Sequence, residues 1–202
     1  MEIKPQQVKE LRQATGAGVL NCHKALEETD GDFDKAVAIL NEKGLAGAAK
    51  RADRVTPEGV VELYSHGDGR VGVMVEVNCE TDFVGRSEVF RKFAHEIALQ
   101  IAASSPRFVR VEDIPEDVLR GEVEKASAQA KGEGKPEAII ERIVNGRLEK
   151  FKDETCLLRQ PYIRDEEQTI EKLLLQNITT TGENIVIRRF QRWDLGEDFS
   201  QE

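Results

Sequence analysis

Apolar residues recur at helical spacing in three short segments at the start of the chain. The first covers residues 5–15. The second begins after Gly18 and ends at Gly31, and the third runs from Asp32, whose carboxylate can cap a helix, to Gly44. Because helices this short cannot each bury an apolar face alone, we predict that the three pack together as a small bundle.

The pattern changes from helical spacing to alternation after this bundle. Residues 45–56 have a helix-friendly composition but no apolar stripe, and they form either a connecting helix or a linker. From residue 59, apolar residues occupy alternate positions on both sides of the turn sequence Gly-Asp-Gly at 67–69. Alternation around such a turn predicts a β-hairpin over residues 59–79.

A long apolar stripe predicts a helix over residues 87–103, separated from the hairpin by a loop at residues 80–86. Ser87 can cap this helix, and the stripe continues from Phe90 to Ile101. We therefore expect the helix to cover one face of the sheet.

Charged helical segments dominate the next part of the chain. They predict an antiparallel helical pair over residues 116–158, whose second half consists of segments 136–145 and 146–158. A short strand is expected before the pair, at residues 108–111, and a helix after it, at residues 166–178. We expect the pair to project from the body of the protein.

Residues 184–195 alternate like a strand that returns to the first hairpin. Its faces are predicted to carry Ile185, Ile187 and Arg189 on one side and Val186, Arg188 and Phe190 on the other. The elements predict an α+β fold, with an N-terminal three-helix bundle, a small antiparallel sheet with helices on one side, and a short helical pair. We divide the chain into a bundle with its linker, residues 1–54, and a core, residues 55–202. The acidic tail from Asp194 onward is expected to be solvated or disordered.

The composition is that of a soluble globular protein. Of its 202 residues, 39% are hydrophobic and 33% are charged, and the net charge is -9. A surface of that sign repels phosphate backbones, so direct nucleic-acid binding is not expected. No apolar run approaches the ~18 residues of a spanning helix, and the N-terminus lacks a signal-peptide pattern, so we expect a cytoplasmic protein with no membrane partner.

Candidates for bond chemistry are weak. Cys22, Cys79 and Cys156 are far apart and predict reduced thiols, and the histidines lack metal-ligand spacing. A thiol enzyme would need Cys79 to meet His95 in space, and a buried structural thiol is the alternative that we favour. The pattern indicates a protein that works through binding surfaces, with no catalytic residue, metal or cofactor, and hence not an enzyme.

Two segments are suited to binding a partner. At the junction of the first two helices, one of the adjacent residues Val19 and Leu20 is expected to face the bundle and the other to be exposed, although a tight turn explains the junction equally well. In residues 80–86, the adjacent residues Phe83 and Val84 cannot both turn inward, so Phe83 is suited to wedging into another protein. The alternative is that Phe83 caps the end of the core.

Several runs of residues occur in an order that one protein family uses. They are VKELR at 8–12, TGAG at 15–18, CHKAL at 22–26, GD at 31–32, VEVNCETDFV at 75–84 and GENIVIRR at 182–189. These runs resemble the family of bacterial elongation factor Ts, in its short form, and span nearly the whole chain. The resemblance implies a guanine-nucleotide exchange factor for the translational GTPase elongation factor Tu, with a ubiquitin-associated-like bundle and an α+β core.

The resemblance also implies roles for individual residues. In that family the bundle docks on the GTPase domain, and a Thr-Asp-Phe-Val segment enters that domain and displaces the magnesium of the bound nucleotide. The corresponding residues here are Thr81, Asp82, Phe83 and Val84. For the docking contact they are Lys9, Arg12 and Leu20. Asn21 and His23 stand where the family commonly has Asp and Lys, so the polar details of docking differ.

The chain is shorter than relatives that have two core subdomains and a coiled coil. In short members a second copy of the chain can take the place of the second subdomain. A homodimer, giving a heterotetramer with elongation factor Tu, is therefore a further expectation from the resemblance. Two rival functions stay open from the residues alone: an adaptor whose bundle binds an unrelated partner, and a thiol hydrolase that uses Cys79 and His95.

Overall fold

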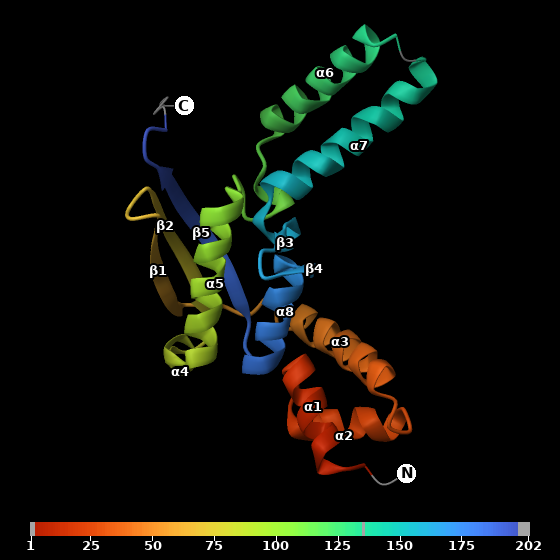
Figure 1. The fold of residues 1–202 in the computed structure, drawn as a ribbon, viewed down its shortest axis with the longest axis vertical. Helices are drawn as coiled ribbons and strands as arrows, with labels where there is room; N and C mark the ends of the chain where they lie inside the picture. The colour runs from red at the N-terminus through yellow and green to blue at the C-terminus, as the bar shows by residue number, and fades with distance from the viewer. Residues whose placement is uncertain (1–2, 135, 198–202) are drawn as a thin grey trace.

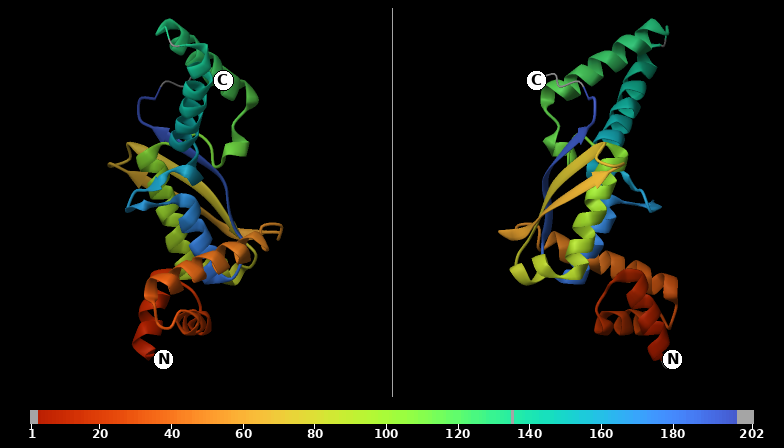
Figure 2. Two further views of the ribbon diagram at one scale, coloured as in Figure 1. Left: turned by 90° about the vertical axis from the view of Figure 1, so that its right-hand side faces the viewer. Right: turned by 60° about the vertical axis from the view of Figure 1, so that its left-hand side comes forward.

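Three parts follow one another along the long axis of the molecule (Figure 1). A helical bundle lies at one end, a sheet with its covering helices lies in the middle, and a helical pair projects at the other end (Figures 1 and 2). The computed structural model describes residues 3–134 and 136–197. Its architecture confirms the predicted α+β fold.

The bundle consists of α1 (Pro5–Thr15), α2 (Val19–Glu28) and α3 (Phe33–Ala49). Asp32 caps α3 by accepting a hydrogen bond from the backbone N–H of Lys35 at 3.1 Å. The side chains that fill the interior come from all three helices: Val8, Leu11, Cys22, Ala25, Leu26, Ala36 and Leu40. The three predicted helices and their mutual packing are confirmed.

Helix α3 is longer than the sequence pattern predicts. It continues through Gly44 to Ala49, and Ala48 belongs to the hydrophobic core of the sheet rather than to that of the bundle. Gly44 packs against Thr179 of α8 (Ile170–Thr181), where a Cβ atom would lie 2.9 Å from the threonine hydroxyl. The glycine therefore permits a close approach between two helices and does not end α3, and the segment after residue 45 begins as helix.

The central sheet is antiparallel, with the strand order β1-β2-β5. Its strands are β1 (Glu58–His66), β2 (Val71–Cys79) and β5 (Ile185–Asp194). Both the predicted hairpin and the return of the last strand to it are confirmed. Gly59 is required where β1 begins, because its φ is 144° and a Cβ atom there would lie 2.1 Å from the carbonyl oxygen of Val77.

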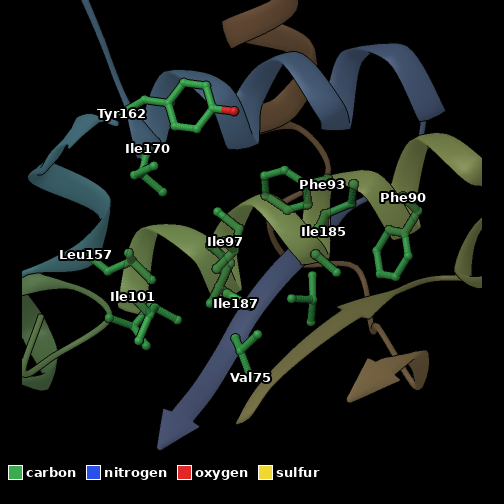
Figure 3. Packing of buried hydrophobic residues seen from close by; sticks show 14 of the residues in the cluster. Val75, Phe90, Phe93, Ile97, Ile101, Leu157, Tyr162, Ile170, Ile185 and Ile187 are labelled. Carbon is green, nitrogen blue, oxygen red and sulfur yellow. The ribbon is translucent and has the colours of Figure 1, made fainter. Parts of the chain in front are cut away.

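Within the described residues, helices cover one face of this sheet only. α5 (Glu88–Ser104) and α8 pack on it, and Figure 3 shows how their side chains meet those of the strands. The core includes Val75, Phe90, Phe93, Ile97, Ile101, Leu157, Tyr162, Ile170, Ile185 and Ile187. On the opposite face Val61, Met74, Leu63 and Trp193 are exposed, the last two by 70% and 65%.

A β-bulge changes the predicted faces of β5. Glu76 pairs with Arg189 and Val77 pairs with Ile187, so Arg188 is an extra residue without its own partner on β2. Beyond the bulge the alternation shifts by one position. Phe190 therefore packs against the core, and Arg189 lies on the outer side, where its Nε donates to Glu76 Oε2 at 2.8 Å. The prediction that Phe190 and Arg188 share a face opposite Ile187 was wrong for this reason.

The helical pair is formed by α6 (Glu116–Gly132) and α7 (Glu137–Thr155), which lie antiparallel (Figure 1). The second member is one continuous helix, so its predicted division at residue 146 was wrong. Gly146 lies inside this helix. The helix tolerates it because a single interior glycine costs only about 1 kcal/mol relative to alanine.

The strand expected at residues 108–111 is reduced to one isolated bridge between Phe108 and Cys156. The chain turns immediately afterwards, because the Asp113 carboxylate accepts a hydrogen bond from the N–H of Arg110 at 3.0 Å. A 3-10 helix, η1 (Val111–Asp113), begins at this point. A second 3-10 helix, η2 (Leu157–Arg159), follows α7.

A small hairpin replaces the first turn of the helix predicted at residues 166–178. Its strands are β3 (Pro161–Tyr162) and β4 (Asp165–Thr169). α8 begins only at residue 170, because Thr169 caps it by accepting from the N–H of Lys172 at 3.3 Å. The expectation of a disordered tail falls mainly on residues 198–202, which lie outside the described residues.

Candidate functional site

The segment between β2 and α5 carries a highly exposed apolar side chain, that of Phe83, on backbone that is held by the core. We predicted a loop at residues 80–86, but most of it is a short helix, α4 (Asp82–Arg86). Thr81 caps this helix, because its hydroxyl accepts a hydrogen bond from the N–H of Val84 at 3.4 Å. Backbone in the extended region at Ser87 then separates α4 from α5.

Phe83 and Val84 point in different directions from α4, as predicted. The side chain of Phe83 is 85% exposed, whereas Val84 is partly buried and packs against the core of the sheet. Adjacent helical residues diverge by about 100°, so only one of the two can face inward. The alternative, in which Phe83 caps the core, was wrong.

Asp82 and Arg86 flank the exposed ring with opposite charges. Arg86 Nη2 lies 3.2 Å from Asp82 Oδ2, and both side chains are exposed. Such an exposed ion pair contributes ~0 to 1 kcal/mol to stability, so both groups are free to re-pair with a partner at small cost.

The base of α4 is packed tightly against the sheet. Gly85 is buried, and a Cβ atom there would lie 3.4 Å from the sulfur of Cys79 and 3.5 Å from the carbonyl oxygen of Gly59. Cys79 Sγ donates to the carbonyl of Thr81 at 3.2 Å, and Arg91 Nε donates to the carbonyl of Gly85 at 3.0 Å. The backbone of α4 is thus held from below while Phe83 points away from the protein.

Sequence reasoning missed one residue of this site, Glu183. Its carboxylate accepts hydrogen bonds from the N–H groups of Glu80 and Thr81, at 3.1 and 3.0 Å, and from the Thr81 hydroxyl at 2.6 Å. The two segments are about a hundred residues apart along the chain. The only sequence signal is indirect: a closing strand that pairs with residues 71–79 must bring its N-terminal end next to residue 80.

The proposed docking residues lie on two helices of the bundle. Lys9 and Arg12 are exposed on α1, and Leu20, on α2, is 77% exposed. Val19 is also exposed, by 52%, so the expectation that one of the two apolar neighbours faces the bundle was wrong. The reason is their place in the first turn of α2, whose inward positions are those of Cys22, Ala25 and Leu26.

The two candidate contact regions lie toward the same end of the molecule. α4 and the bundle are both at the end opposite the helical pair (Figures 1 and 2).

The structure does not pair Cys79 with His95, as a thiol enzyme would require. Burial, followed by the nearby carboxylate of Glu183, raises the pKa of Cys79 to about 11, so this thiol is protonated at neutral pH. The imidazole of His95 contacts a different group, with Nδ1 2.9 Å from Glu62 Oε1. Burial also raises the pKa values of Cys22 and Cys156, so each of the three cysteines is a poor nucleophile.

Residues 3–134 and 136–197 contain neither a cluster suited to a metal ion nor a helix suited to a membrane. No group of three or more His, Cys, Asp or Glu side chains in these ranges is arranged to hold a metal ion. Within the same ranges, no helix has the length and apolar character needed to cross a membrane.

Comparison with known proteins gives a consistent result. A family model described as "Elongation factor TS" matches residues 4–197. A protein named "Elongation factor Ts" from Caldanaerobacter subterraneus subsp. tengcongensis is 58% identical over 195 residues, which are 96% of this chain and 98% of the relative. Proteins of the same name from Carboxydothermus hydrogenoformans and Moorella thermoacetica are 54% and 53% identical over 199 residues, covering 98% of this chain and 92% and 98% of the relatives.

Proposed function

The chain belongs to the elongation factor Ts family, and we propose that it performs that family's nucleotide-exchange role by inserting residues 81–84 into elongation factor Tu. In this proposal the inserted segment displaces the magnesium ion of the bound nucleotide and so releases GDP. In this proposal the work is done by binding alone, so the protein acts as an exchange factor and not as an enzyme. We place this role in the cytoplasm.

The observation that carries the proposal is the exposed ring of Phe83 on a tightly held helix. Large aromatic side chains become binding hot spots when a partner desolvates them in a pocket. A ring on a preorganised support loses little conformational freedom when it binds, so more of its burial energy remains for displacing the nucleotide.

Exchange follows from this binding by thermodynamic linkage. A factor that binds nucleotide-free elongation factor Tu more tightly than the GDP-bound form must weaken GDP binding by the same ratio. Each tenfold increase in that ratio requires about 1.4 kcal/mol more binding free energy for the nucleotide-free form than for the GDP-bound form. A few buried contacts are therefore enough for a large effect.

The direct test is the release of fluorescently labelled GDP from purified elongation factor Tu. We expect catalytic amounts of the protein to accelerate release in the presence of excess unlabelled GDP. An adaptor would bind without accelerating release, and an unchanged release rate in spite of binding would contradict the proposal. Full activity is expected from the metal-free protein and after treatment of the folded protein with an alkylating reagent, because neither a metal nor a thiol takes part.

We also propose that Lys9, Arg12 and Leu20 supply docking and not nucleotide displacement. Leu20 is a large apolar side chain with 77% exposure, and its burial against the GTPase adds affinity. Replacing Leu20 by aspartate should raise the concentration for half-maximal exchange about tenfold and leave the maximal rate within about twofold.

The matched control for this docking prediction is Ile139→Asp. Ile139 is an exposed apolar residue of α7, on the projecting helical pair at the other end of the molecule. This variant should have the same half-maximal concentration and the same maximal exchange rate as the unaltered protein. A lower maximal rate with an unchanged half-maximal concentration for Leu20→Asp would contradict the docking role.

The uncovered face of the sheet leads us to propose a homodimer. Leu63, Met74 and Trp193 form an apolar depression on this face, and Glu76 and Arg189 lie beside it. A second copy related by a two-fold axis brings the same apolar surface and both signs of charge, so the face is complementary to itself. This copy would take the place of the second core subdomain found in longer relatives.

The oligomeric state in solution tests this dimer. Met74→Glu places a carboxylate in the middle of the face, and burying it unpaired is costly. We expect light scattering to give twice the chain mass for the unaltered protein and the monomer mass for Met74→Glu at micromolar concentration. Ala128→Glu, at an exposed position on α6 and away from the sheet, is the control and should stay dimeric. A monomeric unaltered protein would contradict the proposal.

A further inference from the structure

We propose that Glu183 is a positioning residue for nucleotide exchange, and that its carboxylate holds the start of α4 so that Phe83 projects in the productive direction. The inference rests on the inserted role of residues 81–84. It assigns a function to a residue that lies about a hundred positions later in the chain, two residues before β5 begins.

Both oxygens of the Glu183 carboxylate are engaged. Oε2 accepts the backbone N–H groups of Glu80 and Thr81, and Oε1 accepts the Thr81 hydroxyl. Hydrogen bonds to an ionised acceptor are stronger than neutral ones, and three of them fix the orientation of the peptide unit that they surround. The contacts meet at the residue that caps α4, so they set both the position and the direction of this helix.

Glu183 itself is anchored by its neighbour. The buried Asn184 donates its backbone N–H to Glu80 Oε1 at 2.6 Å, and its side-chain Nδ2 donates to the carbonyls of Ala52 and Arg54 at 3.2 and 3.0 Å. The chain therefore forms a reciprocal pair, in which Glu183 binds the backbone around Glu80 while Glu80 binds the backbone after Glu183. We call this pair the crossed-carboxylate clamp.

The clamp is needed because α4 has little stability of its own. A helix of five residues is far shorter than the ~12 residues at which isolated helices become marginally stable. Packing of Gly85 and Val84 fixes the end nearer to α5, whereas the end nearer to β2 is held by Glu183 and by the weaker hydrogen bond from the Cys79 thiol to the Thr81 carbonyl. Without the carboxylate, the freed N–H and hydroxyl groups of Thr81 are accessible to water.

Loss of the clamp should therefore loosen α4 and leave the core intact. A loosened segment must be ordered again when it enters the partner, and this ordering lowers the gain from inserting Phe83. We expect Glu183→Ala to reduce the maximal exchange rate about tenfold, with a small change in the concentration for half-maximal exchange and in the melting temperature.

Two variants separate position from charge. In Glu183→Gln the amide oxygen can still accept the two backbone N–H groups, and its NH2 group can donate to the Thr81 hydroxyl. This variant should exchange within about threefold of the unaltered protein. Glu149→Ala removes a carboxylate that pairs with Lys152 and Arg159 on the far side of the molecule, and it should exchange normally.

The decisive experiment combines Glu183→Ala with Phe83→Ala in a double-mutant cycle. If Glu183 acts by aiming Phe83, the double variant should lose no more than about twofold beyond Phe83→Ala alone. Fully multiplicative losses would show that Glu183 acts by another route and would overturn the inference. Backbone hydrogen exchange at residues 81–86 should be faster in Glu183→Ala and normal in Glu183→Gln.

The outcomes distinguish this inference from the proposed function. Normal nucleotide exchange by Glu183→Ala, together with defective nucleotide exchange by Phe83→Ala, would overturn the clamp and leave the insertion of Phe83 standing. Normal exchange by Phe83→Ala would overturn the proposed insertion itself. Unchanged hydrogen exchange at residues 81–86 in Glu183→Ala would overturn the clamp whatever the release assay gives.

Discussion

Phe83→Ala is expected to lower the efficiency of GDP release from elongation factor Tu at least thirtyfold while the protein stays as stable as before. The ring is 85% exposed, so its truncation removes little apolar area that folding had buried. In a complex that desolvates the ring, truncation of an aromatic hot spot costs ~2 kcal/mol or more, which corresponds to a roughly thirtyfold loss.

Thermal unfolding and GDP release measured on the same sample test this prediction. The melting temperature should change little, and the exchange efficiency per molecule should fall. Phe83→Leu is an informative companion, because it keeps an apolar side chain and should retain an intermediate efficiency. A large fall in melting temperature with normal exchange per folded molecule would show that Phe83 belongs to the protein's own core.

Phe90→Ala should give the opposite result seven residues later in the chain. Phe90 is fully buried between α5 and the sheet, with 0% exposure (Figure 3). Truncating a buried phenylalanine removes its transfer free energy and leaves a cavity, so we expect the free energy of unfolding to fall by ~3 to 5 kcal/mol.

Urea unfolding gives the stability of Phe90→Ala, and the release assay should be corrected for the folded fraction. Exchange per folded molecule should stay within about threefold of normal, since the ring does not reach the surface that we assign to the partner. A folded Phe90→Ala protein of normal stability that had lost exchange would contradict the separation between core and contact surface.

The elements that sequence reasoning found are those with strong periodic patterns. The stripe of α5 and the alternation of β2 predict both the elements and the inward-facing residues. The β-bulge at Arg188 was missed, because residues 184–195 were assigned a single period of two although the consecutive arginines Arg188 and Arg189 interrupt the alternation there. β4 was missed because its sequence, DEEQT, has no apolar alternation and pairs only with a two-residue strand.

The candidate site divides in the same way. That one of the adjacent residues Phe83 and Val84 faces outward could be predicted, since two large neighbours on a short segment cannot both face the core, but the structure decides that it is Phe83. Glu183 could not, because its role depends on the register between β2 and β5, and therefore on the position of the bulge. Val19 was misjudged because the exact start of α2 decides which of its residues face inward.

The length of helix α3 sets the distance and the relative orientation of the two contact regions. Its first half carries Ala36 and Leu40 into the interior of the bundle, and its last turn carries Ala48 into the core beneath the sheet. Each residue of a helix adds 1.5 Å and turns the following part by about 100°. A one-residue insertion between Leu40 and Ala48 would thus swing Leu20 to another side of the molecule, whereas a change of a whole turn would keep its direction. The number of residues in α3 must therefore match the spacing of the two binding sites on the partner. This holds although α3 supplies none of the contact residues assigned here.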